Sequence, residues 1–124
     1  MRPSILIVDD DEDLRATLGM TLDELYGCDW IGAPSVDGMI ALGDRALSCA
    51  VAILDINLGR DQPSGLDAFE WLTAQDFAGR IVFLTGHARS HPLVDAARRE
   101  QRASVYEKPL TVGQLGKLIE ARSA

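Results

Sequence analysis

The sequence predicts a doubly wound α/β fold, in which five parallel strands form one sheet with helices on both of its faces. Short apolar runs alternate with longer amphipathic stretches about five times, which is the pattern of such a sheet. Three of the runs are almost continuously apolar through their middles, as strands covered on both faces by helices must be. The chain has 124 residues, of which 47% are hydrophobic, so we expect one compact domain.

Five strands are predicted from the apolar runs. They are expected at residues 4–9, 29–33, 50–55, 80–85 and 103–107. The first predicted helix spans residues 12–26 and places four leucines on one stripe, with Gly27 as its stop. These leucines are Leu14, Leu18, Leu22 and Leu25.

The second predicted helix, at residues 35–47, begins with Ser35 as a capping residue, although Gly38 and Gly43 each weaken it by about 1 kcal/mol relative to alanine. Two later helices begin at capping pairs. Ser64 and Asp67 open a helix that runs to about residue 76, and Thr111 and Gln114 open the last helix. Between these two, Pro92 is a suitable early residue for a helix that ends near residue 101.

Charge and composition disfavour several classes of function. The chain has 12 Lys and Arg against 19 Asp and Glu, a net charge of −7, so we expect no direct binding to nucleic acid or to an anionic membrane. The longest apolar stretch without charges, residues 46–54, is far below the roughly 20 residues of a membrane span. Cys28 and Cys49 are too few for a disulfide framework, which favours a cytoplasmic location.

Chemically distinctive residues follow or end four of the predicted strands. In an open parallel sheet, ligands bind beyond the carboxyl ends of the strands. The residues expected there are Asp9, Asp10, Asp11, Asp55, Thr85, Lys108 and Pro109. Carboxylates this close together repel each other unless a cation intervenes, and oxygen ligands of this kind favour Mg²⁺. A carboxylate that can itself be phosphorylated would complete the metal's shell, with Lys108 and Thr85 available for the remaining phosphoryl oxygens.

Each of these residues has a simpler explanation when taken alone. The acidic residues after the first strand could cap the following helix, and Asp55 could cap a turn. Thr85 could be an ordinary strand residue, and Lys108 with Pro109 a surface turn. Their joint occurrence at four strand ends favours a functional site.

Three other kinds of site fail on spacing. A calcium-binding loop starting at Asp9 would need Gly where Leu14 stands and Glu where Met20 stands. The turn after the first strand lacks the G-x-G-x-x-G pattern of dinucleotide binding. A phosphatase of the haloacid-dehalogenase type would need a second aspartate two residues after Asp55, where this chain has Asn57.

Four segments at these strand ends resemble the bacterial response-regulator receiver domains of two-component signalling. They are VDDDEDLR at 8–15, ILDIN at 53–57, LTGHA at 84–88 and EKP at 107–109. The resemblance covers residues 4–121. It implies a flavodoxin-like strand order, 2-1-3-4-5, and a single receiver domain over residues 1–124.

The resemblance also implies roles for the acidic residues. Asp55 would accept a phosphoryl group from a phosphohistidine on a partner kinase. Asp10 and Asp55 would ligate Mg²⁺ together with the backbone carbonyl of Asn57, and Asp9 would act mainly through a metal-bound water. Thr85 and Lys108 would hold phosphoryl oxygens and stabilise the transferred group.

Three departures from the family pattern concern the loops and the switch. The loop after Asp55 is about two residues longer than usual and has Gly59 where proline is customary, and the small residue that usually precedes the last strand is blurred in QRAS at 101–104. The Lys108–Pro109 peptide, in contrast, is expected to be cis, as the resemblance implies. The aromatic switch residue usually lies three positions before the lysine, where this chain has Val105. Tyr106, one residue later, could take that place only if the strand slipped or bulged, because neighbouring strand residues point to opposite faces.

The expected function is that of a phosphoacceptor receiver in a two-component phosphorelay, a signalling protein that assists only its own phosphoryl transfer and dephosphorylation. Phosphorylation would change the face built from the helix at 92–101, the strand at 103–107 and the last helix. Expected partners are a sensor histidine kinase or phosphotransfer protein, an unknown output protein and, as a further candidate, a second phosphorylated copy. The alternatives are a receiver-like interaction module that works without phosphorylation, and a phosphatase-type hydrolase.

Overall fold

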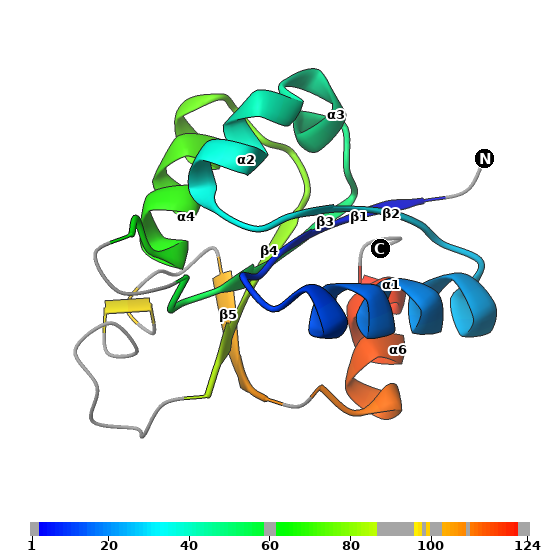
Figure 1. Cartoon of the computed structure of the whole chain (residues 1–124). Helices are drawn as coiled ribbons and strands as arrows, with labels where there is room; N and C mark the ends of the chain where they lie inside the picture. The colour runs from blue at the N-terminus through cyan, green and yellow to red at the C-terminus, as the bar shows by residue number, and fades with distance from the viewer. Residues whose placement is uncertain are drawn as a thin grey trace.

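A computed structural model describes residues 3–58, 62–86, 96–97, 99, 103–108 and 110–121 of the chain. They form one five-stranded parallel sheet with the order β2-β1-β3-β4-β5 (Figure 1). The strands are β1 (Ser4–Val8), β2 (Asp29–Ala33), β3 (Val51–Asp55), β4 (Arg80–Thr85) and β5 (Ala103–Glu107). The predicted sheet and its order are confirmed, with differences of one residue at the end of β1 and at the start of β3.

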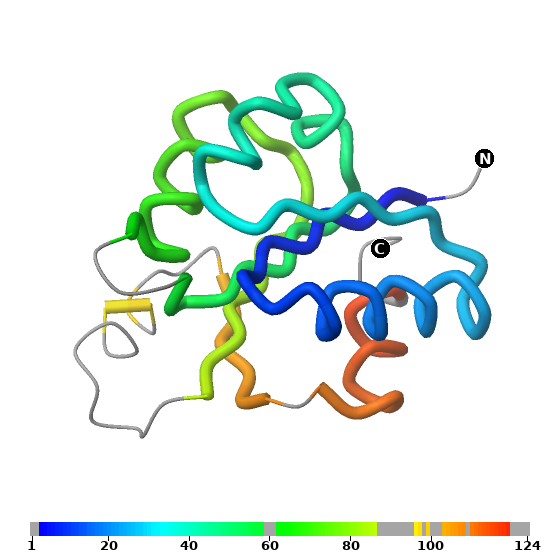
Figure 2. Tube along the Cα trace, in the orientation of Figure 1, coloured from blue at the N-terminus to red at the C-terminus, as the bar shows by residue number. Residues whose placement is uncertain are grey.

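The described helices cover both faces of this sheet. They are α1 (Glu12–Tyr26), α2 (Val36–Leu42), α3 (Asp44–Leu47), α4 (Gly65–Ala74) and α6 (Val112–Ala121). In Figure 1, α2, α3 and α4 lie on one side of the strands, and α1 and α6 lie on the other. The tube in Figure 2 shows β1, in dark blue, between β2 in cyan and β3 in green. The doubly wound arrangement is therefore confirmed.

The strands are covered by apolar side chains that alternate between the two faces. In β1, Leu6 and Val8 belong to the cluster under α2 and α4, whereas Ile5 and Ile7 belong to the cluster under α1 and α6. The same alternation continues through β3 and β4. Because both faces are packed, the carboxyl ends of these strands are rigid positions for functional side chains.

The helix α1 has the predicted bounds but not the whole predicted stripe. Asp11 caps its first turn by accepting a hydrogen bond from Leu14 N at 3.1 Å. Leu18 and Leu22 are buried, but Leu25 is 56% exposed, so its predicted inward position is wrong. Tyr26 follows Leu22 at the spacing of four that continues the buried face, and it packs against the core in place of Leu25.

The single helix predicted over residues 35–47 is wrong, because Gly43 divides it into α2 and α3. Gly43 has φ 56° and ψ −125°, a conformation that side chains rarely allow. Its backbone N–H donates to Ile40 O at 3.0 Å and ends α2. Gly43, which the sequence predicts only to weaken one long helix, therefore separates two helices.

Both predicted capping pairs are present. Ser64 N donates to Asp67 Oδ2 at 2.8 Å at the start of α4, which ends at Ala74, two residues before the predicted end. At the start of α6, Thr111 N donates to Gln114 Oε1 at 2.9 Å, and Gln114 N donates to Thr111 Oγ1 at 3.1 Å. These pairs fix where the two helices begin.

Some expectations fall on residues outside the described part of the chain. They are the Lys108–Pro109 peptide, Gly59 and most of the helix predicted at 92–101, of which Ala96 and Ala97 are described and helical. Among the helices that are described, none is both long and apolar enough to cross a membrane.

Candidate functional site

The sheet brings four of the predicted site residues to one edge. Asp9 follows β1, Asp55 ends β3, Thr85 ends β4 and Lys108 follows β5. Asp9, Asp55 and Thr85 are 1%, 4% and 1% exposed, so three polar side chains are buried at the carboxyl ends of adjacent strands. Buried polar groups are retained at a cost to stability, which marks this edge as a candidate site.

Lys108 joins the two buried carboxylates. Its Nζ lies 3.1 Å from Asp9 Oδ2 and 3.1 Å from Asp55 Oδ2. Its backbone N–H donates to Thr85 O at 2.8 Å, which ties the end of β5 to the end of β4. The ammonium is therefore held above the carboxylates by the backbone of the neighbouring strand.

Asp9, Asp10 and Asp55 form an acidic cluster, in which one carboxylate oxygen from each lies within 4.8 Å of the others. Asp10 is exposed and the other two are buried. Asp9 Oδ1 accepts from Asp11 N at 2.9 Å, and Asp55 Oδ1 accepts from Asn57 N at 3.3 Å. Asp9 Oδ2 is buried and contacts Lys108 as an ion pair, but the described residues give it no hydrogen bond. Such a donor set of carboxylate oxygens fits a hard divalent cation.

The cluster is electrostatically strained. Burial, and then the charge of Asp9, raise the pKa of Asp55 to about 6, although Lys108 acts in the opposite direction. Burial by itself would lower the pKa of Lys108, but the charges of Asp55 and Asp9 outweigh it and raise that pKa above the usual value. Three carboxylates face one ammonium, so a divalent cation would relieve the remaining repulsion.

Gly65, at the start of α4, is a part of the site that the sequence did not reveal. Its N–H donates to Ile56 O at 2.9 Å. A Cβ at this position would lie 2.4 Å from Asp55 O and 2.9 Å from Ile56 Cα. Only glycine therefore allows α4 to begin against the backbone of Asp55.

The sequence also did not reveal the contact of Arg15, whose Nη1 donates to Asp9 O at 2.6 Å. The available signal was the position of a cation early in α1, where the dipole of a helix favours anions.

The two candidate switch residues lie on opposite faces of β5. The pairing of β4 with β5 is continuous, with Val105 opposite Phe83 and Tyr106 opposite Leu84. Val105 packs against the cluster under α2 and α4, and Tyr106 against the cluster under α1 and α6. The described strand has no slip or bulge that would bring Tyr106 to the face of Val105.

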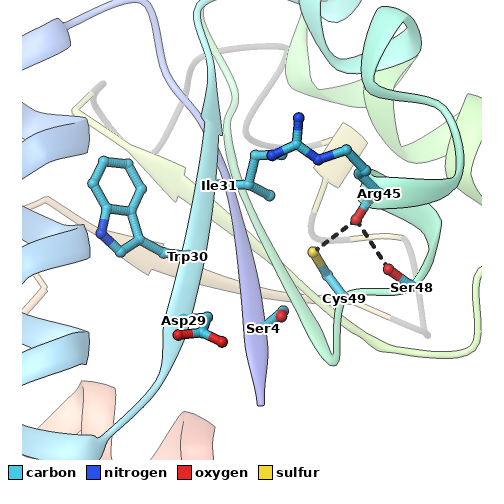
Figure 3. Close-up of a pocket in the computed structure, with 7 residues that line it drawn as sticks. All are labelled: Ser4, Asp29, Trp30, Ile31, Arg45, Ser48 and Cys49. Atoms are coloured by element: carbon cyan, nitrogen blue, oxygen red, sulfur yellow. Dashed lines mark hydrogen bonds between the residues drawn. The ribbon is translucent and has the colours of Figure 1, made fainter. Parts of the chain in front are cut away.

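A cavity of about 240 Å³ lies at the opposite edge of the sheet, where β1 and β2 begin (Figure 3). Its lining consists of Ser4, Asp29, Trp30, Ile31, Arg45, Ser48 and Cys49. Trp30 extends toward α1, away from Arg45 (Figure 3). Burial raises the pKa of the Cys49 thiol to about 11, with Arg45 opposing it, so this thiol is protonated at neutral pH and not an activated nucleophile. The cavity is also smaller than the roughly 300 Å³ of common ligand pockets.

Residues 5–120 match the family described as the response regulator receiver domain. The chain therefore belongs to that family, and it is a receiver domain of the two-component response-regulator type. No curated protein sequence matches the chain.

Solved receiver structures share this fold. A response regulator receiver domain protein from Clostridium thermocellum has a TM-score of 0.80 at 23% identity, over 97% of this chain and 93% of that one. The receiver domain of NtrX from Brucella abortus has a TM-score of 0.78 at 27% identity, over 95% and 96%. The chemotaxis protein CheY4 from Vibrio cholerae has a TM-score of 0.78 at 21% identity, over 98% of both chains.

Proposed function

We propose that this receiver domain is a phosphoacceptor in which Asp55 takes a phosphoryl group from a phosphohistidine in a Mg²⁺-dependent reaction. The donor would be a sensor histidine kinase or a phosphotransfer protein. The observation that carries the proposal is the position of Asp55, which is buried at the end of β3, shares an acidic cluster with Asp9 and Asp10, and contacts Lys108 at 3.1 Å.

Asp10, Asp55 and the backbone carbonyl of Asn57 would hold the metal, with Asp9 acting through a metal-bound water. The carboxylate oxygens of Asp9, Asp10 and Asp55, which lie within 4.8 Å of one another, support a cation at this edge. When bound, Mg²⁺ would neutralise negative charge on the phosphoryl oxygens.

The residues of the chain supply the nucleophile and the electrostatic stabilisation. A carboxylate oxygen of Asp55 forms the new bond to phosphorus while the bond from phosphorus to the imidazole nitrogen breaks, and the imidazole leaves with the bonding electron pair. With a pKa of about 6, Asp55 is mostly ionised at neutral pH and can act as a nucleophile. The Lys108 ammonium and the Thr85 hydroxyl stabilise charge on the transferred group.

The phosphorylated domain would act by changing the surface it offers to an output partner. Thr85 is buried beside the site, and its backbone carbonyl accepts a hydrogen bond from the N–H of Lys108. This bond connects the site to the end of β5. The responding face would include β5 and α6, and the partner would be another protein or a second phosphorylated copy of the chain. We propose that residues 1–124 act as one domain and do so in the cytoplasm, because two cysteines are too few for the disulfide framework of an extracellular domain.

The experiment is incubation of the purified domain with acetyl phosphate and Mg²⁺, followed by intact-mass measurement. We expect the mass of one phosphoryl group to be gained by the wild type and by Glu70→Gln, an exposed carboxylate change on α4. Asp55→Asn should gain none, and chelation of Mg²⁺ should stop the reaction. A wild type that stays unmodified, or an Asp55→Asn variant that reacts at the wild-type rate, would overturn the proposal.

A further inference from the structure

Arg15 lies at a position in α1 where a positive charge does not stabilise the helix. It is the fourth residue of α1, in the N-terminal part of the helix, where the dipole disfavours a cation. Its side chain is half-buried, and Nη1 donates to the backbone carbonyl of Asp9 at 2.6 Å. A charge-assisted bond of this length is strong, so it holds the turn between β1 and α1.

This bond completes the restraint of Asp9. The N–H of Asp9 donates to Ala33 O in β2 at 3.1 Å, and its two carboxylate oxygens contact Asp11 N at 2.9 Å and Lys108 Nζ at 3.1 Å. The carbonyl that Arg15 holds belongs to the peptide between Asp9 and Asp10. Arg15 therefore fixes the plane from which the exposed Asp10 side chain projects.

The course of the Arg15 side chain is set by packing against β2. A Cβ at Gly32 would lie 3.2 Å from Arg15 Cδ and 3.4 Å from Arg15 Nε, so the side chain lies against bare backbone at this position. The same Cβ would lie 3.2 Å from Trp30 Cζ3. The Trp30 ring in turn lies over Gly19, where a Cβ would be 2.0 Å from Cε2. The two glycines leave space for Trp30 and Arg15 between α1 and β2.

We propose that Arg15 is a positioning residue for the metal site, which holds the Asp9–Asp10 peptide so that both carboxylates face Asp55. The inference rests on the proposed Mg²⁺ site but goes beyond it, since Arg15 is not among the residues that would touch the metal or the phosphoryl group. Partners outside the ligand shell commonly change metal affinity about 10- to 100-fold when they are removed.

Removal of Arg15 should change the Mg²⁺ affinity in opposite directions, depending on whether Arg15 positions the Asp9–Asp10 peptide or acts only through its charge. If Arg15 acted only as a nearby positive charge, its removal would reduce repulsion of Mg²⁺ and strengthen binding. If Arg15 holds the Asp9–Asp10 peptide, its removal leaves the Asp9 carbonyl without this hydrogen bond. Asp10 is then less well positioned, and Mg²⁺ binding becomes weaker. Lysine keeps the charge but lacks the planar guanidinium fork, so Arg15→Lys should restore binding only in part.

The test is the dissociation constant of Mg²⁺ measured by calorimetry, without any phosphodonor. We expect Arg15→Met to weaken Mg²⁺ binding about 10- to 100-fold, while Arg45→Met, an identical charge change beside the distant cavity, stays within twofold of wild type. Urea unfolding without Mg²⁺ identifies the variants that are folded, and only those are compared. Unchanged or tighter binding by folded Arg15→Met would overturn the inference.

A double-mutant cycle with Gly32→Val supplies an independent route. The valine would crowd the Arg15 side chain without removing it, so Gly32→Val alone should weaken Mg²⁺ binding several-fold. In the Arg15→Met background it should have no further effect, because the bond it disturbs is already absent. Full additivity of the two losses would contradict the inference. A wild type that does not bind Mg²⁺ would instead overturn the metal site of the proposed function.

Discussion

Asp55 is a carboxylate buried beside a second carboxylate, that of Asp9, and contacted by one ammonium, that of Lys108. Its raised pKa shows that the folded protein disfavours the charged form. The nucleophile that the proposed reaction needs is therefore a source of instability when no metal is bound.

Asp55→Asn should raise the free energy of unfolding in Mg²⁺-free buffer at pH 7 by about 1–2 kcal/mol. The pKa of Asp55 is about 6 when folded against an ordinary value of 3.8, so the folded state binds the proton more tightly. Stability is thus lost as the pH rises through this window, and the full loss is present above about pH 6. Urea unfolding between pH 4 and pH 7 would measure it.

In the wild type the free energy of unfolding should fall across that window more steeply than in Asp55→Asn. Glu70→Gln serves as the control, since Glu70 is an exposed carboxylate on α4. An Asp55→Asn variant that is less stable than wild type at pH 7 would show that the Lys108 contact outweighs the burial of the charge.

The acidic and basic residues of the site could be predicted one by one from the ends of the strands, as Asp9, Asp55 and Lys108 were. The contributions of Arg15 and Gly65 could not. Each depends on a contact with backbone that another segment brings close, Asp9 O for Arg15 and Asp55 O for Gly65. A cation early in α1 was a signal for Arg15, but no local pattern in the sequence identifies the backbone group that Arg15 or Gly65 contacts.

Capping residues predicted the starts of α2, α4 and α6, because the bonds of a cap are local in sequence. The interiors were less predictable. The sequence indicates that Gly43 weakens a helix. The break between α2 and α3, however, depends on the positive φ that Gly43 adopts, and the presence of a glycine alone does not reveal that conformation.

Two identical substitutions should therefore have opposite effects. Gly43→Ala should lower the free energy of unfolding by about 1–3 kcal/mol, since alanine is strained at φ 56° and ψ −125°. Gly113→Ala, in the first turn of α6, should raise it by about 0.5–1 kcal/mol, because a Cβ there meets only Thr111 Oγ1 at 3.9 Å. Urea unfolding of both variants would measure the difference, and equal signs would contradict this account of the break.

The strand β5 separates the two candidate switch residues by face. Because Tyr106 packs against the apolar cluster on the face of α1 and α6, and Val105 packs against the cluster on the opposite face, a Tyr106 ring cannot move into the place of Val105 without breaking the strand register. The Val105 side chain is restricted at its first torsion and is too short to move between an outward and an inward position. We therefore expect the signal to pass through Thr85.

Amide hydrogen exchange across β5 and α6, with and without acetyl phosphate and Mg²⁺, would test this route. Thr85→Ala should abolish the phosphorylation-dependent change in exchange, while Tyr106→Leu should keep most of it. Intact mass must show equal phosphorylation in both variants. If Tyr106→Leu removed the response as completely as Thr85→Ala, Tyr106 would be the switch.

For the whole molecule, the number and direction of the strands followed from apolar periodicity, and their order followed from the family resemblance. The arrangement is constrained, because parallel strands need crossovers and the two packed faces leave few alternatives. The cavity beside Arg45 and Cys49 could not be predicted. It arises from how α3 and the start of β2 pack, which periodicity does not determine.

The net charge of −7 and the acidic cluster make the whole domain sensitive to cations. Specific Mg²⁺ binding to the folded state should stabilise it by about 2.7 kcal/mol at 100 times the dissociation constant. For a domain of this size, each kcal/mol raises the melting temperature by roughly 3 to 6 °C. General screening also stabilises an acidic protein, so sodium chloride at equal ionic strength is the necessary reference.

We therefore expect Mg²⁺ to raise the melting temperature of the wild type well beyond the sodium chloride reference. Asp10→Asn should lose most of that excess, because it removes one exposed carboxylate of the cluster, whereas Glu24→Gln makes the same charge change on the exposed face of α1 and should keep it. The comparison within each variant removes any effect of the substitution on the metal-free protein. Equal responses of Asp10→Asn and Glu24→Gln would mean that Mg²⁺ acts on the total charge of the domain and not at the carboxyl edge of its sheet.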